Sequence, residues 1–207
     1  MTDWHLWHEQ YDDPSSSLSR RLEVVRRLLT GVVEPMGGEH RVLSLCAGDG
    51  RDVIPVVAGL PAPRRPDLVL VELDDQLASA ARDKARDAGI HATVIAADAG
   101  NTSLWRQHLP VDVLMLCGIF GNISDDDIRA TIEAAPAMVV KGGTIIWTRG
   151  ARRERDLRQQ VRQWFGDAGF SEIDFESEPG GFGVGVNRWP DATAPSAIPD
   201  QLFTFVR

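Results

Sequence analysis

Residues 41–52 constrain the fold of this 207-residue chain more than any other stretch. They form an apolar run (Val42, Leu43 and Leu45) followed by a turn that contains Gly48 and Gly50. The run is typical of a strand buried on both faces, and the glycines allow a sharp turn with bare backbone close to a ligand. We predict that a helix follows. A strand, a glycine turn and a helix together form the entrance to a nucleotide-binding fold.

Two acids accompany this turn. Asp49 and Asp52 are predicted to lie in the first turn of the following helix, where the positive end of the helix dipole favours carboxylates. Their negative charge affects which kind of nucleotide the site can bind.

The rest of the chain alternates between apolar strands and amphipathic helices, which predicts a Rossmann-like α/β fold. We expect a doubly wound, mostly parallel sheet with helices on both faces and an antiparallel strand near the C-terminus. Strands are predicted at 67–74, 91–97, 111–117, 144–148 and 170–175, with further candidates at 181–189 and 202–206. Helices are predicted at 18–32, 75–88, 101–109, 153–168 and after Ser124, which we expect to cap its helix.

The N-terminal arm is unusually aromatic. Trp4, Trp7, His8 and Tyr11 fall on one face of a short helix, which is either a packing element or a lid over a ligand. We therefore divide the chain into an arm and helix at residues 1–39, with a possible lid function, and one ligand-binding domain at residues 40–207.

Composition limits the partners. The formal net charge of −8 argues against nucleic acid, because phosphate binding needs clustered Lys and Arg. We find no window near the ~18 apolar residues of a membrane span and no signal-peptide pattern. Cys46 and Cys117 both lie in apolar runs, which indicates a reduced, cytoplasmic protein in which they are small buried hydrophobic residues. No His, Cys or carboxylate cluster has metal-ligand spacing, so no metal is predicted.

Acids follow the predicted strands at the edge where parallel sheets bind ligands. Glu72 ends the second strand, 24 positions after Gly48, about the offset at which an acid accepts hydrogen bonds from both ribose hydroxyls. Asp98 ends the third strand, where an adenine amino group could be recognised.

A dinucleotide is the first rival ligand. Its fingerprint needs glycine or alanine at a third position, where this chain has the bulky Val53. Asp49 and Asp52 would also face a pyrophosphate, and like charges ~5 Å apart cost roughly 3 kcal/mol at an effective dielectric constant near 20. The same acids suit a cofactor that carries an ammonium and a sulfonium.

The order of these motifs resembles the class I S-adenosylmethionine-dependent methyltransferases over roughly residues 40–207, and in particular small bacterial members without an assigned substrate. The first-strand turn of that family has the form apolar-x-acid-x-Gly-x-Gly-x-Gly. Gly48 and Gly50 stand on two of its glycines, Cys46 replaces the first, and Ser44 stands where an acid is common.

The resemblance implies a seven-stranded sheet whose last strand is antiparallel. It also implies that Glu72 binds the ribose, that Asp98 lies beside the adenine, and that residues 116–122 lie beside the methionine part and the substrate. The implied cofactor-binding residues are Cys46, Ala47, Gly48, Asp49, Gly50, Asp52, Glu72, Leu73, Asp98, Ala99, Cys117 and Gly118.

The implied activity is methyl transfer from S-adenosyl-L-methionine to a small molecule by a monomer or homodimer, driven mainly by proximity and orientation and leaving S-adenosyl-L-homocysteine. His5 and His8 are the candidates for a general base, if one is needed. Tyr11, Asn122 and Arg149 are the candidates for orienting the substrate. The alternatives are an NAD(P)-dependent oxidoreductase and a protein that binds S-adenosylmethionine without transferring its methyl group.

One further pattern has two interpretations. Gly183 and Gly185 alternate with larger residues, which leaves one face of the predicted strand at 181–189 bare. Such a face usually serves close packing, and here it could also receive a substrate.

Overall fold

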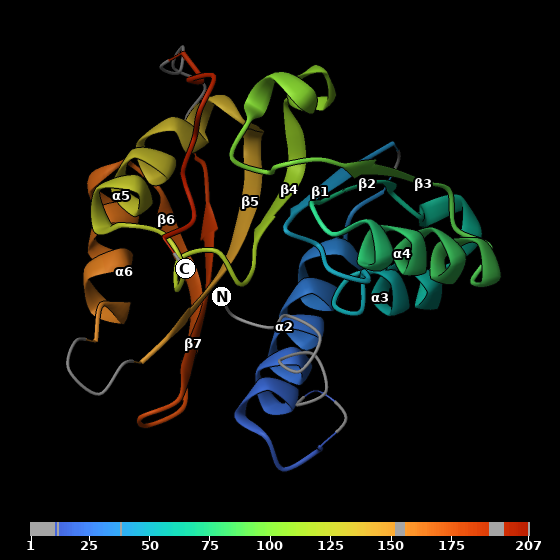
Figure 1. Ribbon diagram of the computed structural model, residues 1–207, viewed down its shortest axis with the longest axis horizontal. Coiled ribbons are helices and arrows are strands. Elements are labelled where there is room, and N and C mark those ends of the chain that lie inside the picture. The colour runs from blue at the N-terminus through green and yellow to red at the C-terminus, as the bar shows by residue number, and fades with distance from the viewer. Residues whose placement is uncertain (1–10, 12, 38, 152–155, 191–196, 207) are drawn as a thin grey trace.

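The computed structural model describes residues 11, 13–37, 39–151, 156–190 and 197–206. It contains a seven-stranded sheet in the order β3-β2-β1-β4-β5-β7-β6 (Figure 1). The strands are β1 (Arg41–Leu45), β2 (Asp67–Glu72), β3 (Ala92–Ala96), β4 (Val111–Leu116), β5 (Val139–Gly150), β6 (Ser171–Ser177) and β7 (Phe182–Arg188). The pairs among β1 to β5 are parallel, whereas β7 runs antiparallel to β5 and β6. The predicted fold class is confirmed.

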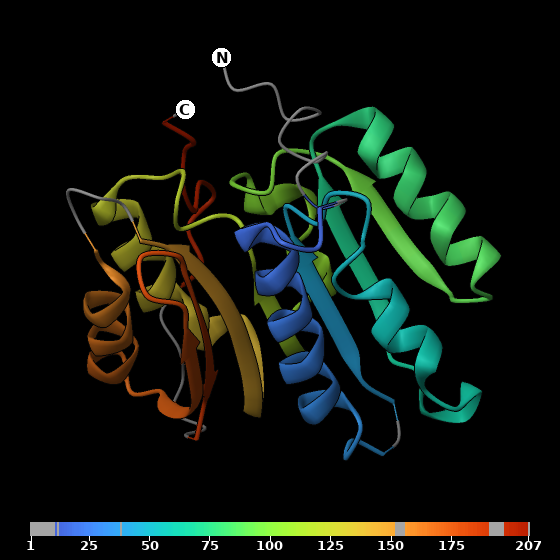
Figure 2. The ribbon, with the colours of Figure 1, turned by 90° about the horizontal axis from the view of Figure 1, so that it is seen from below.

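Helices cover both faces of the sheet (Figures 1 and 2). The α-helices are α2 (Ser17–Val33), α3 (Ile54–Gly59), α4 (Asp75–Asp87), α5 (Asp125–Ala134) and α6 (Arg158–Asp167). Short 3-10 helices are η2 (Ala62–Arg64), η3 (Thr102–Leu104), η4 (Arg106–His108) and η5 (Ala135–Ala137).

The strand β1 shows why the central strands are mostly apolar. Val42 packs in the core formed with α2, α3 and α4, whereas Leu43 and Leu45 pack in the core formed with α5 and α6. Because both faces of the strand are covered, most of its side chains are apolar, and Ser44 is its one buried polar residue.

Caps and ion pairs fix the ends of the helices near the site. Asp74 caps α4 by accepting hydrogen bonds from the amides of Gln76 and Leu77, and Ser124 caps α5 as predicted. The helix α2 is tied to the β6–β7 hairpin by an ion pair between Arg20 and Glu178, 2.7 Å apart. None of the helices in the described ranges is long and apolar enough to cross a membrane.

Three local predictions are wrong. Asp49 and Asp52 lie in the turn before α3, which begins only at Ile54. The predicted helix at 101–109 is a pair of 3-10 turns, η3 and η4. The predicted strand at 202–206 makes isolated bridges instead, between Gln201 and Asn101 and between Phe205 and Ile123.

The C-terminal segment packs against the connection between β3 and β4. Leu202 and Phe203 are buried in the same core as Trp105, which lies in the β3–β4 connection. Two consecutive residues therefore point into the core, which a regular strand with alternating faces does not allow.

Candidate active site

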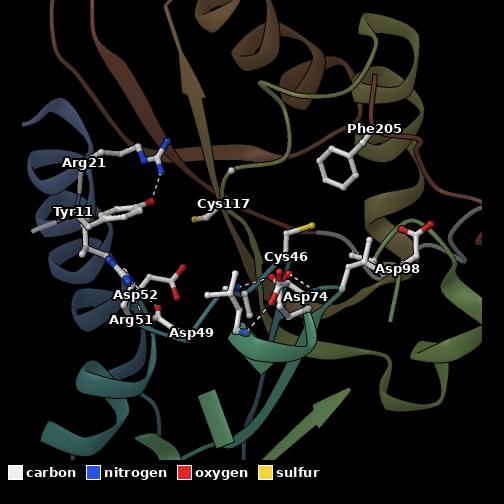
Figure 3. Close-up of a pocket in the computed structure, with 18 residues that line it drawn as sticks. Tyr11, Arg21, Cys46, Asp49, Arg51, Asp52, Asp74, Asp98, Cys117 and Phe205 are labelled. Carbon is white, nitrogen blue, oxygen red and sulfur yellow. Dashed lines mark hydrogen bonds and ion pairs between the residues drawn. The ribbon is translucent and has the colours of Figure 1, made fainter. Parts of the chain in front are cut away.

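A cavity of about 500 Å³ opens at the carboxyl edge of the parallel strands (Figure 3). Its walls come from the loops after β1, β2, β3 and β4, from α2 and α4, and from the C-terminal segment. The lining residues are Tyr11, Arg21, Leu22, Cys46, Ala47, Gly48, Asp49, Arg51, Asp52, Glu72, Leu73, Asp74, Leu77, Asp98, Ala99, Cys117, Gly118 and Phe205. Of the twelve cofactor-binding residues expected from the sequence, Gly50 is the one absent from this lining.

The turn after β1 has a backbone that favours glycine. Cys46, Gly48 and Gly50 have φ angles of 55°, 56° and 71°, which non-glycine residues adopt at a cost. Gly50 acts through this conformation and through close packing, since a Cβ there would lie 2.4 Å from Cδ1 of Ile54. Cys46 therefore stands at the family's first glycine position with the backbone of a glycine.

This geometry gives a prediction about stability. Cys46→Gly and Cys46→Ala both remove the sulfur, but alanine keeps a Cβ in the left-handed region. We expect the glycine variant to be more stable than the alanine variant by about 1 kcal/mol, measured by urea unfolding. Equal stabilities, or a more stable alanine variant, would show that the left-handed backbone at residue 46 costs little.

Glu72 joins the ends of β1 and β2. Its Oε2 accepts a hydrogen bond from the amide of Gly48 at 2.7 Å, and its Oε1 accepts one from the amide of Asp74 at 3.0 Å. Burial raises the pKa of the carboxyl, and these backbone amides oppose the shift. The carboxylate is therefore held at the cavity wall with its orientation set by backbone atoms.

Asp49 lines the cavity, but its carboxylate is already paired. The residue is 5% exposed, and its Oδ1 and Oδ2 accept hydrogen bonds from Nε and Nη2 of Arg51, both at 2.8 Å. Lys84 on α4 makes a further ion pair with Oδ2. Burial alone would raise the pKa of Asp49, but the two cations hold it well below its usual value. Asp49 thus anchors the turn to α4.

Asp52 has a buried carboxyl whose two oxygens are not both hydrogen-bonded. Its Oδ1 is buried and accepts no hydrogen bond from the chain as far as the structure describes it. Burial raises the pKa of the carboxyl to about 6; backbone amides and Arg21 oppose the shift, and Asp49 adds to it. An unpaired carboxylate oxygen in such a place is costly, and a cationic ligand group would satisfy it.

Tyr11 and Arg21 lie at the same end of the cavity as Asp52 (Figure 3). Nη2 of Arg21 donates a hydrogen bond to the hydroxyl of Tyr11 at 2.6 Å, and the guanidinium of Arg51 lies over the tyrosine ring, 4.6 Å from its centroid. Burial raises the pKa of Tyr11. This end therefore presents both a carboxylate and guanidinium groups, which suits a zwitterionic amino acid.

Phe205 and Asp98 lie on the opposite side of the cavity (Figure 3). Leu73, which follows Glu72 at the end of β2, also lines the cavity and is 67% exposed. Oδ1 of Asp98 accepts a hydrogen bond from the amide of Gly100 at 2.8 Å. A flat group with a polar edge fits this combination.

The two cysteines reach the cavity as thiols. Burial raises the pKa of Cys46 well above its usual value, with Glu72 and Asp98 adding to the effect. Burial and the charge of Asp52 also raise the pKa of Cys117. Since the thiolate is the reactive form, neither sulfur is activated as a nucleophile. The described residues include no group of three or more His, Cys, Asp and Glu side chains that could hold a metal ion.

The structure places two predicted substrate-orienting residues away from the cavity lining. Nδ2 of Asn122 donates to the carbonyl of Gly118 at 2.8 Å, and Nη1 of Arg149, which is 5% exposed, donates to the carbonyl of Phe120 at 2.6 Å. Both side chains shape the loop between β4 and α5. His5 and His8 lie outside the described residues.

Six lining residues were not indicated by the sequence; two of them lie in the predicted loops after β1 and β2, and the others lie on α2, on α4 and in the C-terminal segment. They are Arg21, Leu22, Arg51, Asp74, Leu77 and Phe205. Arg21 and Leu22 lie on α2. The apolar periodicity of this segment predicted a helix, but it did not indicate which of the polar residues face the edge of the sheet. Phe205 lies in the segment 202–206, which the sequence indicated only as a strand candidate.

No protein-family model and no curated protein matches the sequence, but solved structures do. Magnesium protoporphyrin IX methyltransferase from Synechocystis PCC 6803, solved with bound S-adenosylmethionine, matches with a TM-score of 0.68 at 15% identity over 90% of this chain and 91% of its own. An O-methyltransferase family 2 protein from Planctomyces limnophilus DSM 3776, in complex with apigenin, has a TM-score of 0.62 at 14% identity over 83% of this chain and 59% of its own.

A third similar structure is the [4+2]-cyclase SpnF, with a TM-score of 0.61 at 16% identity over 86% of this chain and 85% of its own. At such identities the likeness concerns the fold. The chain therefore has the Rossmann-like fold of class I S-adenosylmethionine-dependent methyltransferases.

Proposed function

We propose that the protein transfers the methyl group of S-adenosylmethionine to a small molecule. The observation that carries this proposal is the charge of the cavity. Among the described lining residues, five are acids and two are arginines. Arg51 and Lys84 pair with Asp49, which leaves four acids against Arg21, and these acids are Asp52, Glu72, Asp74 and Asp98. A cofactor with a sulfonium and an ammonium gains from such walls, whereas a dinucleotide would bring a dianionic pyrophosphate against them.

The residues present fit such a cofactor from end to end. Asp52, with its buried unpaired oxygen, and Arg21 suit the ammonium and the carboxylate of the methionine part. Glu72, fixed by two backbone amides, suits the ribose hydroxyls. Asp98 lies one strand further along the sheet edge, where a carboxylate can accept a hydrogen bond from the adenine amino group.

The role of the protein in this reaction is to orient the reactants. S-adenosylmethionine supplies a methyl group that is already activated by its sulfonium. The chain holds that group at the β1 turn and excludes water with apolar lining such as Leu22 and Cys117. Orientation of this kind can supply an effective molarity of ~10⁵ M or more.

Asp52 gives the proposed site a pH dependence. Its folded-state pKa of about 6 lies above the usual value of 3.8, so the folded protein retains a proton that the unfolded chain has lost between these values. The stability that this carboxyl contributes is therefore present below pH 3.8 and lost as the pH rises through 6. Cofactor affinity should change in the opposite direction, because only the ionised carboxyl attracts an ammonium.

We expect S-adenosylhomocysteine to bind about ten-fold more weakly at pH 5 than at pH 7, since about a tenth of a group with this pKa is ionised at pH 5. Calorimetric titration across this range measures the change. In Asp52→Asn this dependence of the affinity on pH should largely disappear, because the amide does not titrate. An equally steep profile in that variant would assign the effect to another group.

The activity itself is tested by incubating the protein with S-adenosylmethionine and a broad panel of small molecules and measuring the S-adenosylhomocysteine formed. The proposal predicts turnover with at least one acceptor class. Tight cofactor binding without any methylated product would favour a protein that uses the cofactor otherwise. One similar structure is named as a [4+2]-cyclase, so this fold also occurs in a protein named for another reaction.

A further inference from the structure

Residues 197–206, here called the C-terminal strap, cross two of the loops that form the cavity. The amide of Leu202 donates to the carbonyl of Gly100 at 2.7 Å in the loop after β3, and the amide of Val206 donates to the carbonyl of Asn122 at 2.9 Å in the loop after β4. Isolated bridges at Gln201 and Phe205 reinforce these contacts. The strap therefore ties the two loops together at the edge of the site.

The contact between the strap and the β3 loop is close. A Cβ on Gly100 would lie 2.3 Å from the carbonyl oxygen of Phe203, so the two backbones touch at this point. The amide of Gly100 also orients the Asp98 carboxylate. The strap and the acid at the end of β3 thus belong to one packed unit.

Phe205 is the strap residue that lines the cavity. Its ring is supported from behind by Phe203, which is 1% exposed and meets it edge to face with centroids 5.5 Å apart at 81°. Figure 3 places Phe205 on the side of Cys46 and Asp98, away from Tyr11 and Arg21. The ring therefore presents an apolar surface on the side of the cavity that holds Asp98.

We propose that Phe205, positioned by the C-terminal strap, is the aromatic wall against which the adenine ring of the cofactor packs. The inference rests on the proposed function. A purine needs apolar surface against its faces and a hydrogen-bond acceptor at its amino edge. Phe205 and Leu73 supply the first and Asp98 supplies the second, so the last residues of the chain complete the cofactor site.

The test measures binding to the full chain by titration calorimetry with two probes. S-adenosylhomocysteine contains both ends of the cofactor, and 5′-methylthioadenosine contains the adenosine part without the amino acid. Phe205→Ala should weaken both by about ten-fold or more, the scale of losing one aromatic stack on a base, and Phe205→Leu by a smaller factor. Val206→Ala is the matched control, because Val206 is a strap residue that is 62% exposed and should change neither affinity.

The outcomes separate this inference from the proposed function. Wild-type protein that binds neither probe would contradict both. Wild-type binding with unchanged affinities in Phe205→Ala, or a loss confined to S-adenosylhomocysteine, would overturn the inference alone. If Phe205→Ala fails to fold by circular dichroism, Phe205→Leu decides the question, and unchanged affinity for 5′-methylthioadenosine in that variant overturns the inference.

Discussion

Glu72→Ala is expected to weaken S-adenosylhomocysteine binding by about 100-fold or more. Hydrogen bonds to a charged group contribute about 1.5–3 kcal/mol each, and a carboxylate at the ribose makes two of them. The substitution also removes the acceptor that holds the amide of Gly48, 2.7 Å from Oε2, so the β1 turn loses its tie to β2. Titration calorimetry with the purified variant measures the loss.

Two variants control for this result. Glu72→Gln keeps one acceptor oxygen and nearly the same shape, and should lose about ten-fold, consistent with keeping part of the hydrogen bonding. Glu133→Ala removes an exposed acid on α5 that pairs with Arg129 and should leave binding unchanged. Glu72→Ala with wild-type affinity would show that the ribose does not lie at the end of β2.

Gly185→Ala is expected to cost about 3 kcal/mol of unfolding free energy, at the upper end of typical overpacking. A Cβ at Gly185 would lie 2.3–2.4 Å from ring atoms of Trp147. That ring cannot move aside easily, because it stacks near Phe165 at 5.7 Å and Phe175 at 5.9 Å. Its Nε1 also donates to Oδ1 of Asn187 at 2.8 Å.

Urea unfolding of Gly185→Ala against Gly150→Ala isolates the steric effect. Both substitutions reduce the entropy of the unfolded chain equally, but a Cβ at Gly150 meets nothing within 4 Å. Combining Gly185→Ala with Trp147→Leu should cost less than the sum of the two single changes, because the clash disappears with the ring. Simple additivity of the two costs would refute the clash as the cause.

The glycines on one face of β7 show what a sequence pattern can predict. The alternation at 183 and 185 indicated either close packing or room for a substrate, and Gly185 packs against the Trp147 ring. The core strands and helices were predicted because long apolar runs and stripes are local signals. The predicted turn residues converge on one cavity because the carboxyl ends of parallel strands meet at one sheet edge.

What the sequence did not reveal depends on contacts between distant residues. The pairing of Asp49 with Lys84 joins residues 35 positions apart, and it engages an acid that we had expected to face the cofactor. Arg21 lines the cavity because α2 packs against the sheet next to the cavity. The strap could not be recognised either, because its backbone pairs at single residues with two loops and not along a strand.

The most direct test of the central claim is titration calorimetry of the wild-type protein with S-adenosylhomocysteine and, separately, with NAD. The account predicts saturable binding of S-adenosylhomocysteine and none of NAD, because the acidic lining favours an ammonium and repels a pyrophosphate. Binding of NAD with no binding of S-adenosylhomocysteine would contradict it.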